Sequence, residues 1–168
     1  MSERAAPPGR LALVQALVNT LDVASGADAL DTADGRAPFG LTEDTVASAR
    51  ELRESLRATL LAHAGHPPHR AVTPLGELLA RAPLVVTVDP ADGSAALVPV
   101  DDGPLLARIA AAVAEAVTAG TWNRLKACEA DDCLWAYYDR SPAGRGRWCS
   151  MQVCGARAKM RRYRAKGA

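Results

Sequence analysis

The stretch from Lys126 to Lys166 reads KACEADDCLWAYYDRSPAGRGRWCSMQVCGARAKMRRYRAK and holds all four cysteines of the 168-residue chain. Two pairs with the same C-x4-C spacing, separated by 15 residues, are formed by Cys128, Cys133, Cys149 and Cys154. Structural zinc sites use a closed tetrahedron of thiolates, and two short-range cysteine pairs can supply one. The spacing therefore predicts a structural zinc site with four cysteine ligands, with two disulfides or unliganded thiols as the alternatives.

The expected compartment favours the metal. The first ten residues, MSERAAPPGR, lack the charged-then-apolar order of a secretion signal, and no run of eighteen apolar residues exists to span a membrane. We therefore expect a cytoplasmic protein. Thiols stay reduced in the cytosol, where paired cysteines act more often as metal ligands than as disulfides.

The residues between and after the cysteine pairs suggest a small hairpin followed by a helix. An aromatic strand is expected at 134–138, a turn-rich loop at 139–146, and a return strand at Arg147-Trp148. The chain is helix-compatible from Cys154 to Lys166. An apolar cluster is expected from Trp135, Tyr137 and Trp148. Zinc binding of about 10–16 kcal/mol is large enough to fold so small a module.

This segment resembles the CGNR zinc finger, named for Cys-Gly-Asn-Arg at the fourth ligand. The matching run is 154–157, Cys-Gly-Ala-Arg, and the Asp-Arg-Ser turn at 139–141 and Arg-Trp-Cys-Ser at 147–150 also match. Ala156 replaces the motif's Asn, so no contact of that Asn carries over. The resemblance implies a zinc-binding module with Arg157 retained.

Residues 1–120 predict a mostly helical α+β domain. Helices are expected at about 10–25, 42–64, 73–80 and 104–118 from apolar residues three and four apart, with capping signals at several ends. A β-hairpin is expected from strands at 84–88 and 95–100, with Pro99 marking an edge strand. The fold class is therefore α+β, with this domain at 1–120 and a small C-terminal four-cysteine zinc finger (hairpin and helix) at 121–168.

Two polar features interrupt the helical pattern. Asn19 and Asp22 share a face of the first helix, where they form either a hydrogen-bonded patch or the wall of a small-molecule effector pocket. His63, His66 and His69 could bind a metal, but Pro67-Pro68 prevents their alignment on one helix, so a histidine-rich loop is favoured.

The runs Leu17–Asp22 and Leu52–Arg57 resemble the ABATE domain, which commonly precedes the CGNR finger. The resemblance implies a stress-linked bacterial regulator of transcription.

The charge is divided between the two segments. Residues 120–168 carry 11 Lys/Arg against 4 Asp/Glu, and residues 1–119 carry 9 against 15, giving +7 and −6. Such asymmetry suggests a polyanionic partner for the basic segment. Alternatively, the basic segment docks on the acidic domain of the same chain, or its terminal helix is simply solvated. In the terminal helix, Ala156, Met160 and Tyr163 lie on a narrower face that can pack back on the finger. The candidate DNA contacts are Arg145, Arg147, Arg157, Lys159, Arg161, Arg162 and Arg164.

No catalytic motif is present in the sequence, and a zinc ion held by four cysteines leaves no position open for water, so we expect no enzyme. The sequence predicts a zinc-bearing DNA-binding regulator with a ligand-sensing or regulatory N-terminal domain. A homodimer is expected if binding is sequence-specific. The alternatives are a protein-interaction module, or a small-molecule-binding protein or enzyme in which the finger is a structural clip.

Overall fold

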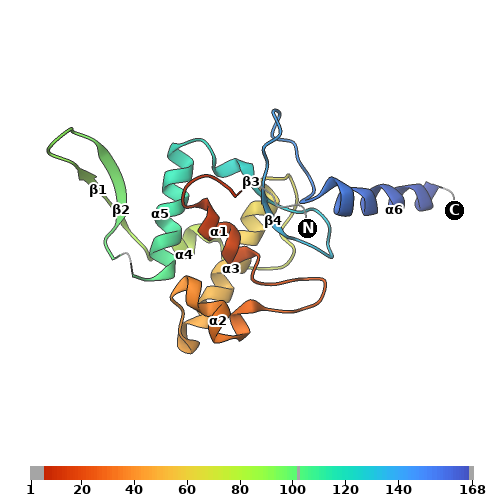
Figure 1. Cartoon of the computed structure of the whole chain (residues 1–168), viewed down its shortest axis with the longest axis horizontal. Helices are drawn as coiled ribbons and strands as arrows, with labels where there is room; N and C mark the ends of the chain where they lie inside the picture. Colours follow the sequence, from red (N-terminus) through yellow and green to blue (C-terminus); the bar gives the residue numbers. More distant parts are fainter. Residues whose placement is uncertain (1–5, 102, 167–168) are drawn as a thin grey trace.

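The computed structural model describes residues 6–101 and 103–166, which form a helical body with an extension at each end (Figure 1). Its helices are α1 (Leu11–Val18), α2 (Ala33–Arg36), α3 (Val46–Ala62), α4 (Leu75–Leu79), α5 (Leu105–Thr118) and α6 (Ala156–Lys166). Its strands are β1 (Leu84–Val88), β2 (Ala95–Pro99), β3 (Leu125–Ala127) and β4 (Ala136–Tyr138), paired as two antiparallel hairpins, β1-β2 and β3-β4. This confirms the α+β class.

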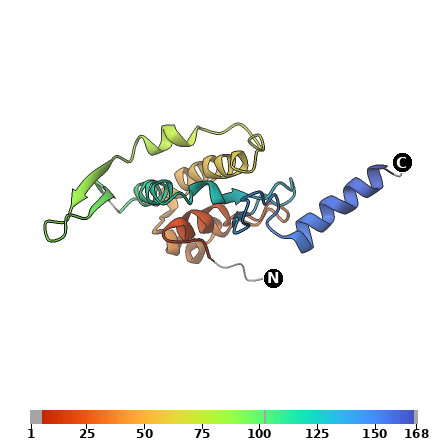
Figure 2. The ribbon, with the colours of Figure 1, turned by 90° about the horizontal axis from the view of Figure 1, so that it is seen from above.

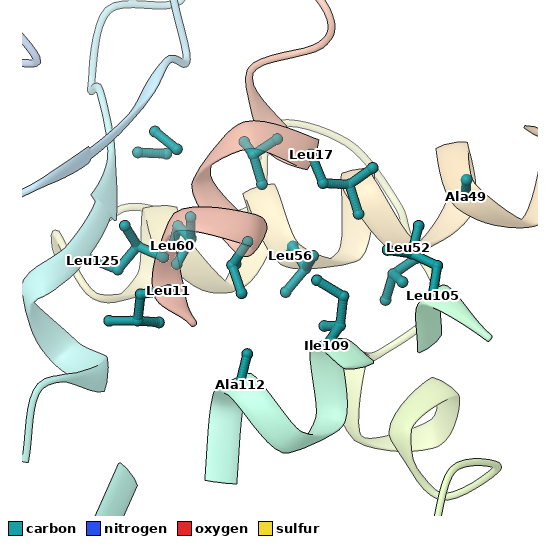
Figure 3. Packing of buried hydrophobic residues seen from close by; sticks show 14 of the residues in the cluster. Leu11, Leu17, Ala49, Leu52, Leu56, Leu60, Leu105, Ile109, Ala112 and Leu125 are labelled. Carbon is teal, nitrogen blue, oxygen red and sulfur yellow. The ribbon is translucent and has the colours of Figure 1, made fainter. Parts of the chain in front are cut away.

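The main core lies between α1, α3 and α5 and also takes in the β3-β4 hairpin. Leu11 and Leu17 from α1, Leu56 from α3 and Ile109 from α5 are at most 1% exposed and pack with one another (Figure 3). Leu125 of β3, completely buried, belongs to the same cluster. The hairpin that begins the cysteine-bearing segment is therefore part of the helical body rather than a separate appendage.

The first helix is shorter than its apolar pattern predicts. α1 ends at Val18, and the chain then turns back so that Leu21 forms an isolated β-bridge with Asp28. The expected helix over 10–25 was wrong beyond Val18, because the polar residues that follow make tertiary hydrogen bonds instead of helical ones.

The third helix carries a buried group of charges that helical periodicity alone does not explain. Arg53, Glu54 and Arg57 are each at most 4% exposed. The Arg57 guanidinium lies 2.9 Å from a Glu54 oxygen and donates to the Val18 carbonyl at 2.8 Å, while Arg53 donates to Asp28 at 2.8 Å. Buried charges require such partners, and these bonds join α3 to the end of α1 and to the loop that follows it.

The two hairpins differ in their surroundings. β1-β2 matches the predicted strands and extends away from the body at one end of the molecule, whereas α6 extends at the other end (Figures 1 and 2). None of the helices in the described part of the chain is both long and apolar enough to cross a membrane.

The pairing of the aromatic strand differs from the expectation. β4 pairs with β3, in the register Leu125↔Tyr138 to Ala127↔Ala136, and not with Arg147-Trp148. Leu125, Ala127 and Ala136 face the main core, which fixes this register, since a slip of one residue in either strand would turn that strand's buried residues away from the core. Lys126, between Leu125 and Ala127, points to the opposite face of the hairpin.

Candidate metal centre and basic helix

The first cysteine pair lies in the loop that joins β3 to β4. Cys128 follows β3 and donates its N–H to the Trp135 carbonyl at 2.9 Å, and Cys133 donates its N–H to Ala130 at 2.8 Å. Leu134, next to Cys133, has a φ of 52° although it is not glycine. Such a left-handed residue costs on the order of 1–2 kcal/mol, which burial of Leu134 in the main core offsets.

The second cysteine pair lies at the entrance to α6. Cys149 precedes Ser150, whose side chain accepts the Val153 N–H at 3.3 Å and caps a π-helical turn, Met151–Gly155, that contains Cys154 and leads into α6. A Cβ on Gly155 would lie 3.1 Å from the Met151 sulfur and 3.4 Å from the Trp148 ring. Glycine therefore lets this turn close over Trp148, and Cys154 falls just before the helix, as the sequence predicts.

Both pairs converge on one point. All four Sγ atoms lie within 4.8 Å of one another; Cys133 and Cys149 are 3.5 Å apart, and Cys149 and Cys154 are 3.7 Å apart. A tetrahedron with metal–sulfur bonds of about 2.3 Å has edges of about 3.8 Å, whereas a disulfide bond is about 2.05 Å long. The four cysteines are free thiols placed to bind one metal ion.

Contacts among three of the thiols shift their pKa values in opposite directions. Hydrogen bonds from Cys133 and Cys149 lower the pKa of Cys128 to about 2, and the hydrogen bond to Cys128 in turn raises the pKa of Cys133 to about 12. Cys149 also forms hydrogen bonds with Cys128 and Cys133. These two bonds, the one with Cys128 more than the one with Cys133, raise the pKa of Cys149. One thiolate thus suppresses ionisation of its neighbours, and a bound cation would reverse this by replacing the shared protons.

Arg157 supports the cluster from outside. Its guanidinium donates to Cys154 Sγ at 3.4 Å and to Asp132, in the first cysteine loop, at 2.9 Å. The hydrogen bond to Cys154 raises the pKa of Arg157, and the charge of Asp132 adds to the effect. The arginine of the Cys-Gly-Ala-Arg run therefore joins the second cysteine pair to the first. The neighbouring Ala156 is exposed.

A buried ion pair holds the loop between the two cysteine pairs. Lys126 Nζ donates to Asp139 Oδ2 at 3.0 Å and also to the Gly144 carbonyl. Asp139 accepts the N–H groups of Ser141 at 3.0 Å and Gly146 at 2.7 Å. Burial acts to raise the pKa of Asp139, but the bonds from Ser141, Gly146 and Lys126 outweigh it and lower this pKa. The Asp139-Arg140-Ser141 turn is thus the anchor of the loop.

A second ion pair ties the loop to the body. Arg147 pairs with both carboxylate oxygens of Glu129, and His66 lies 3.1 Å from the same carboxylate. The Arg147 guanidinium also lies 5.0 Å from the centre of the Trp148 ring. Trp148 packs against the cysteines, whereas Trp135 is 37% exposed, so the cluster expected from Trp135, Tyr137 and Trp148 stays a prediction.

The basic side chains predicted to meet DNA fall into two groups. Arg147 and Arg157, although also exposed, are engaged in the ion pairs described above. Arg145 and the α6 residues Lys159, Arg161, Arg162 and Arg164 are exposed. Helix α6 contains six Lys/Arg and no acidic residue. Ala156 is exposed, and Met160 and Tyr163 are 52% and 77% exposed, so the face that they share does not pack back on the finger.

The side chains of Asn19 and Asp22 both form hydrogen bonds with backbone groups. Asn19 forms two hydrogen bonds with the backbone of Ala136 in β4, donating to its carbonyl at 3.0 Å and accepting its N–H at 2.7 Å. Asp22 accepts the N–H of Ala24 at 2.9 Å. These bonds match the hydrogen-bonded patch, and the effector pocket stays a prediction.

The three histidines have three different partners. His63 Nδ1 lies 2.8 Å from the Leu125 carbonyl, His66 Nε2 lies 3.1 Å from the Glu129 carboxylate, and His69 Nε2 lies 2.9 Å from the Glu54 carboxylate. Within the described residues, the group of three or more His, Cys, Asp or Glu residues placed to bind a metal is the cysteine cluster. The histidines instead connect the end of α3 and the loop after it to β3, to the first cysteine loop and to the buried charges.

The fold and the site together define a helical domain joined to a four-cysteine metal-binding finger. Two family models match the chain in that order. Residues 9–120 match ABATE, described as "Putative stress-induced transcription regulator", and residues 124–167 match the CGNR zinc finger. The chain belongs to the ABATE family and carries a CGNR zinc finger. No curated protein matches the sequence.

Proposed function

We propose that this protein is a transcription regulator that binds double-stranded DNA through α6, held in place by Zn²⁺ on Cys128, Cys133, Cys149 and Cys154. The observation that carries the proposal is the geometry of α6. It extends from the cysteine cluster into solvent, with every residue from Lys159 to Lys166 exposed (Figure 2). A helix of about 11 residues with one anchored end is compatible with a DNA groove.

The four cysteine ligands favour Zn²⁺ as the bound metal. Four thiolates in a closed tetrahedral arrangement suit Zn²⁺ better than harder cations, which prefer oxygen. With all four coordination positions taken by sulfur, the ion would have a structural role and no position for a substrate or water. We therefore propose that the protein is not an enzyme. Arg157 would hold the Cys154 thiolate through its hydrogen bond of 3.4 Å.

The charge distribution supports contact with phosphates. In the described structure, Lys159, Arg161, Arg162 and Arg164 take part in no ion pair with an acidic side chain. Arg157, Arg161 and Arg164 line one side of the helix together with Val153 and Met160. Phosphate contacts would give affinity, while specificity would need contacts with base edges.

The experiment is a salt series of binding to a duplex of random sequence, followed by fluorescence anisotropy on the zinc-loaded chain. Each phosphate contact contributes about 0.9 to the slope of log affinity against log salt. We expect R161Q/R164Q to reduce this slope by about 1.8 and to weaken binding at low salt. The matched control is R10Q/R70Q, which removes the same charge from exposed arginines of the helical body and should leave the slope unchanged.

Two outcomes would overturn the DNA assignment. One is no measurable affinity at low salt for a chain that carries one zinc ion. The other is an equal loss of slope in both double variants, which would indicate a response to net charge alone. Either result would favour the alternative of a protein-interaction module, for which the exposed Met160 and Tyr163 are the first residues to substitute.

A further inference from the structure

The β1-β2 hairpin exposes an unusual amount of apolar surface for a segment at the end of the molecule. Val86 and Val88 on β1 are 68% and 61% exposed, and Leu97, on the same face of β2, is 44% exposed. Neither strand contains a charged residue. Two-stranded hairpins are marginally stable alone and need further strands or a covering element.

The two outer edges of this hairpin are not equivalent. The Asp89 N–H donates to the Ser94 carbonyl at 2.8 Å and the Val100 N–H donates to the Pro83 carbonyl at 3.3 Å, so the backbone N–H and C=O groups of the odd-numbered residues of β1 point toward β2. By the alternation of antiparallel strands, the backbone groups of Leu84, Val86 and Val88 point outward, and so do those of Ala95, Leu97 and Pro99 on β2. Pro99 has no N–H to donate, whereas the β1 edge is complete.

The β1 edge also lacks a partner within the described structure. Among the residues described, the N–H groups of Leu84, Val86 and Val88 form no backbone hydrogen bond, and β1 pairs with β2 alone. Natural proteins usually protect exposed edges with charged residues, proline or bulges. The β1 edge has none of these between Leu84 and Val88, which distinguishes it from the β2 edge.

We propose that β1 pairs with β1 of a second copy of this chain, in an antiparallel register centred on Val86, to form a four-stranded sheet across a two-fold axis. In this register Val86 faces Val86 of the partner, and Leu84 faces the partner's Val88. Leu84, Val86 and Val88 each then face a residue of the partner whose backbone groups also point outward, as a self-complementary interface requires.

The positions of the charged residues around the hairpin fit pairing between two copies of this chain. Antiparallel pairing places the turn of each hairpin, with Asp89 and Asp92, beside the start of β1 in the other copy, where the exposed Arg81 lies. Asp101 follows β2 and therefore lies on the side of the hairpin away from this edge. Because α6 is at the opposite end of the molecule, the two fingers would lie at the two ends of the dimer (Figure 2).

The test is sedimentation of the full zinc-loaded chain in reducing buffer, from micromolar to millimolar concentration. The variant V86P removes an outward-facing donor and none of the N–H groups that bond β1 to β2, and the φ restriction that proline adds is shared by the control below. Because the two-fold axis places the substitution in both copies, two hydrogen bonds across the interface are lost. The dissociation constant of the dimer should therefore rise about tenfold or more. The control L97P makes the same change on the outer edge of β2 and should stay within about twofold of wild type.

Concentration-dependent dimers that V86P disrupts and L97P preserves would support the proposal. A wild-type chain that stays monomeric throughout the range would overturn it. So would an equal effect of V86P and L97P, because the β1 edge would then have no special part in association.

Discussion

Lys126 Nζ lies 3.0 Å from Asp139 Oδ2, and both side chains are at most 5% exposed. Lys126 is on the face of the β3-β4 hairpin that points away from the main core, and Asp139 begins the loop that leads to the second cysteine pair. The hairpin therefore has two roles. One face completes the helical core, and the other holds the loop that brings Cys149 to Cys128.

Removing the lysine should strongly destabilise the protein. K126M leaves the Asp139 carboxylate buried without its cation, and breaking a buried ion pair from one side costs about 3–5 kcal/mol. Urea unfolding of the metal-loaded chain would measure this loss. As a control, R10Q breaks the exposed pair of Arg10 with Glu115, which is 3.5 Å long, and should cost less than about 1 kcal/mol. Similar losses in the two variants would contradict this account of the loop.

Removing the metal should unfold part of the finger and leave the rest folded. The backbone of β3 and β4 is held by the main core, whereas the segment from Cys149 to α6 is held mainly through the cluster. After chelation, hydrogen exchange should accelerate across 149–166 and stay slow at Leu125–Ala127. C154S should reproduce the pattern without a chelator. Uniform loss of protection over the whole chain would show that the body also depends on the metal.

Arg157 should affect metal affinity rather than overall stability. R157A removes the donor to Cys154 Sγ and the link to Asp132, and loss of such an outer contact typically lowers metal affinity about 10–100-fold. Competition against a chromophoric chelator would measure the change. R161A, four residues along the same helix and without a contact to the cluster, should bind the metal as wild type does. Equal affinities for R157A and wild type would contradict the supporting role.

Asn19 should be more important for stability than its neighbour Gln15. N19A loses both hydrogen bonds with Ala136 and leaves the N–H of this buried residue unpaired, although Gln15 still donates to its carbonyl, and should cost about 2–3 kcal/mol. Q15A loses one bond to the same carbonyl, at 3.1 Å, and should cost about 1 kcal/mol. Denaturant unfolding of the two variants tests the ranking. A larger loss for Q15A would show that Asn19 does not fix the end of α1 to β4.

His63 should make the fold sensitive to acid. Burial lowers the pKa of His63 although its bond to the Leu125 carbonyl opposes the shift. Because the pKa is lower in the folded than in the unfolded state, the stabilisation is complete above pH about 6.5 and is lost as the pH falls through the folded value. H63N keeps a donor at the position of Nδ1 but does not titrate. Its free energy of unfolding should therefore fall less between pH 7 and pH 5 than that of wild type, and equal falls would contradict the assignment.

The metal centre could be predicted from the sequence because its determinants are local. Two C-x4-C pairs fix the ligands, and Gly155 with Arg157 fixes the turn at the fourth one. The helices α3 and α5 and the strands β1 and β2 were predicted for the same reason, since their apolar spacing and turn residues act within a few positions.

Tertiary packing decided what local pattern could not. The sequence of 134–138 indicates a strand but not its partner, and the burial of Leu125 and Ala136 against α1 and α3 selected β3 instead of 147–148. The same packing ended α1 at Val18, because Asn19 bonds to Ala136, a residue 117 positions away. Ion pairs formed on folding also divided the basic residues: Arg147 and Arg157 pair with acidic side chains of the finger, whereas Lys159, Arg161, Arg162 and Arg164 lie in solvent. Which charges stay free depends on which acidic side chains the fold brings within reach, and spacing along the chain does not carry that information.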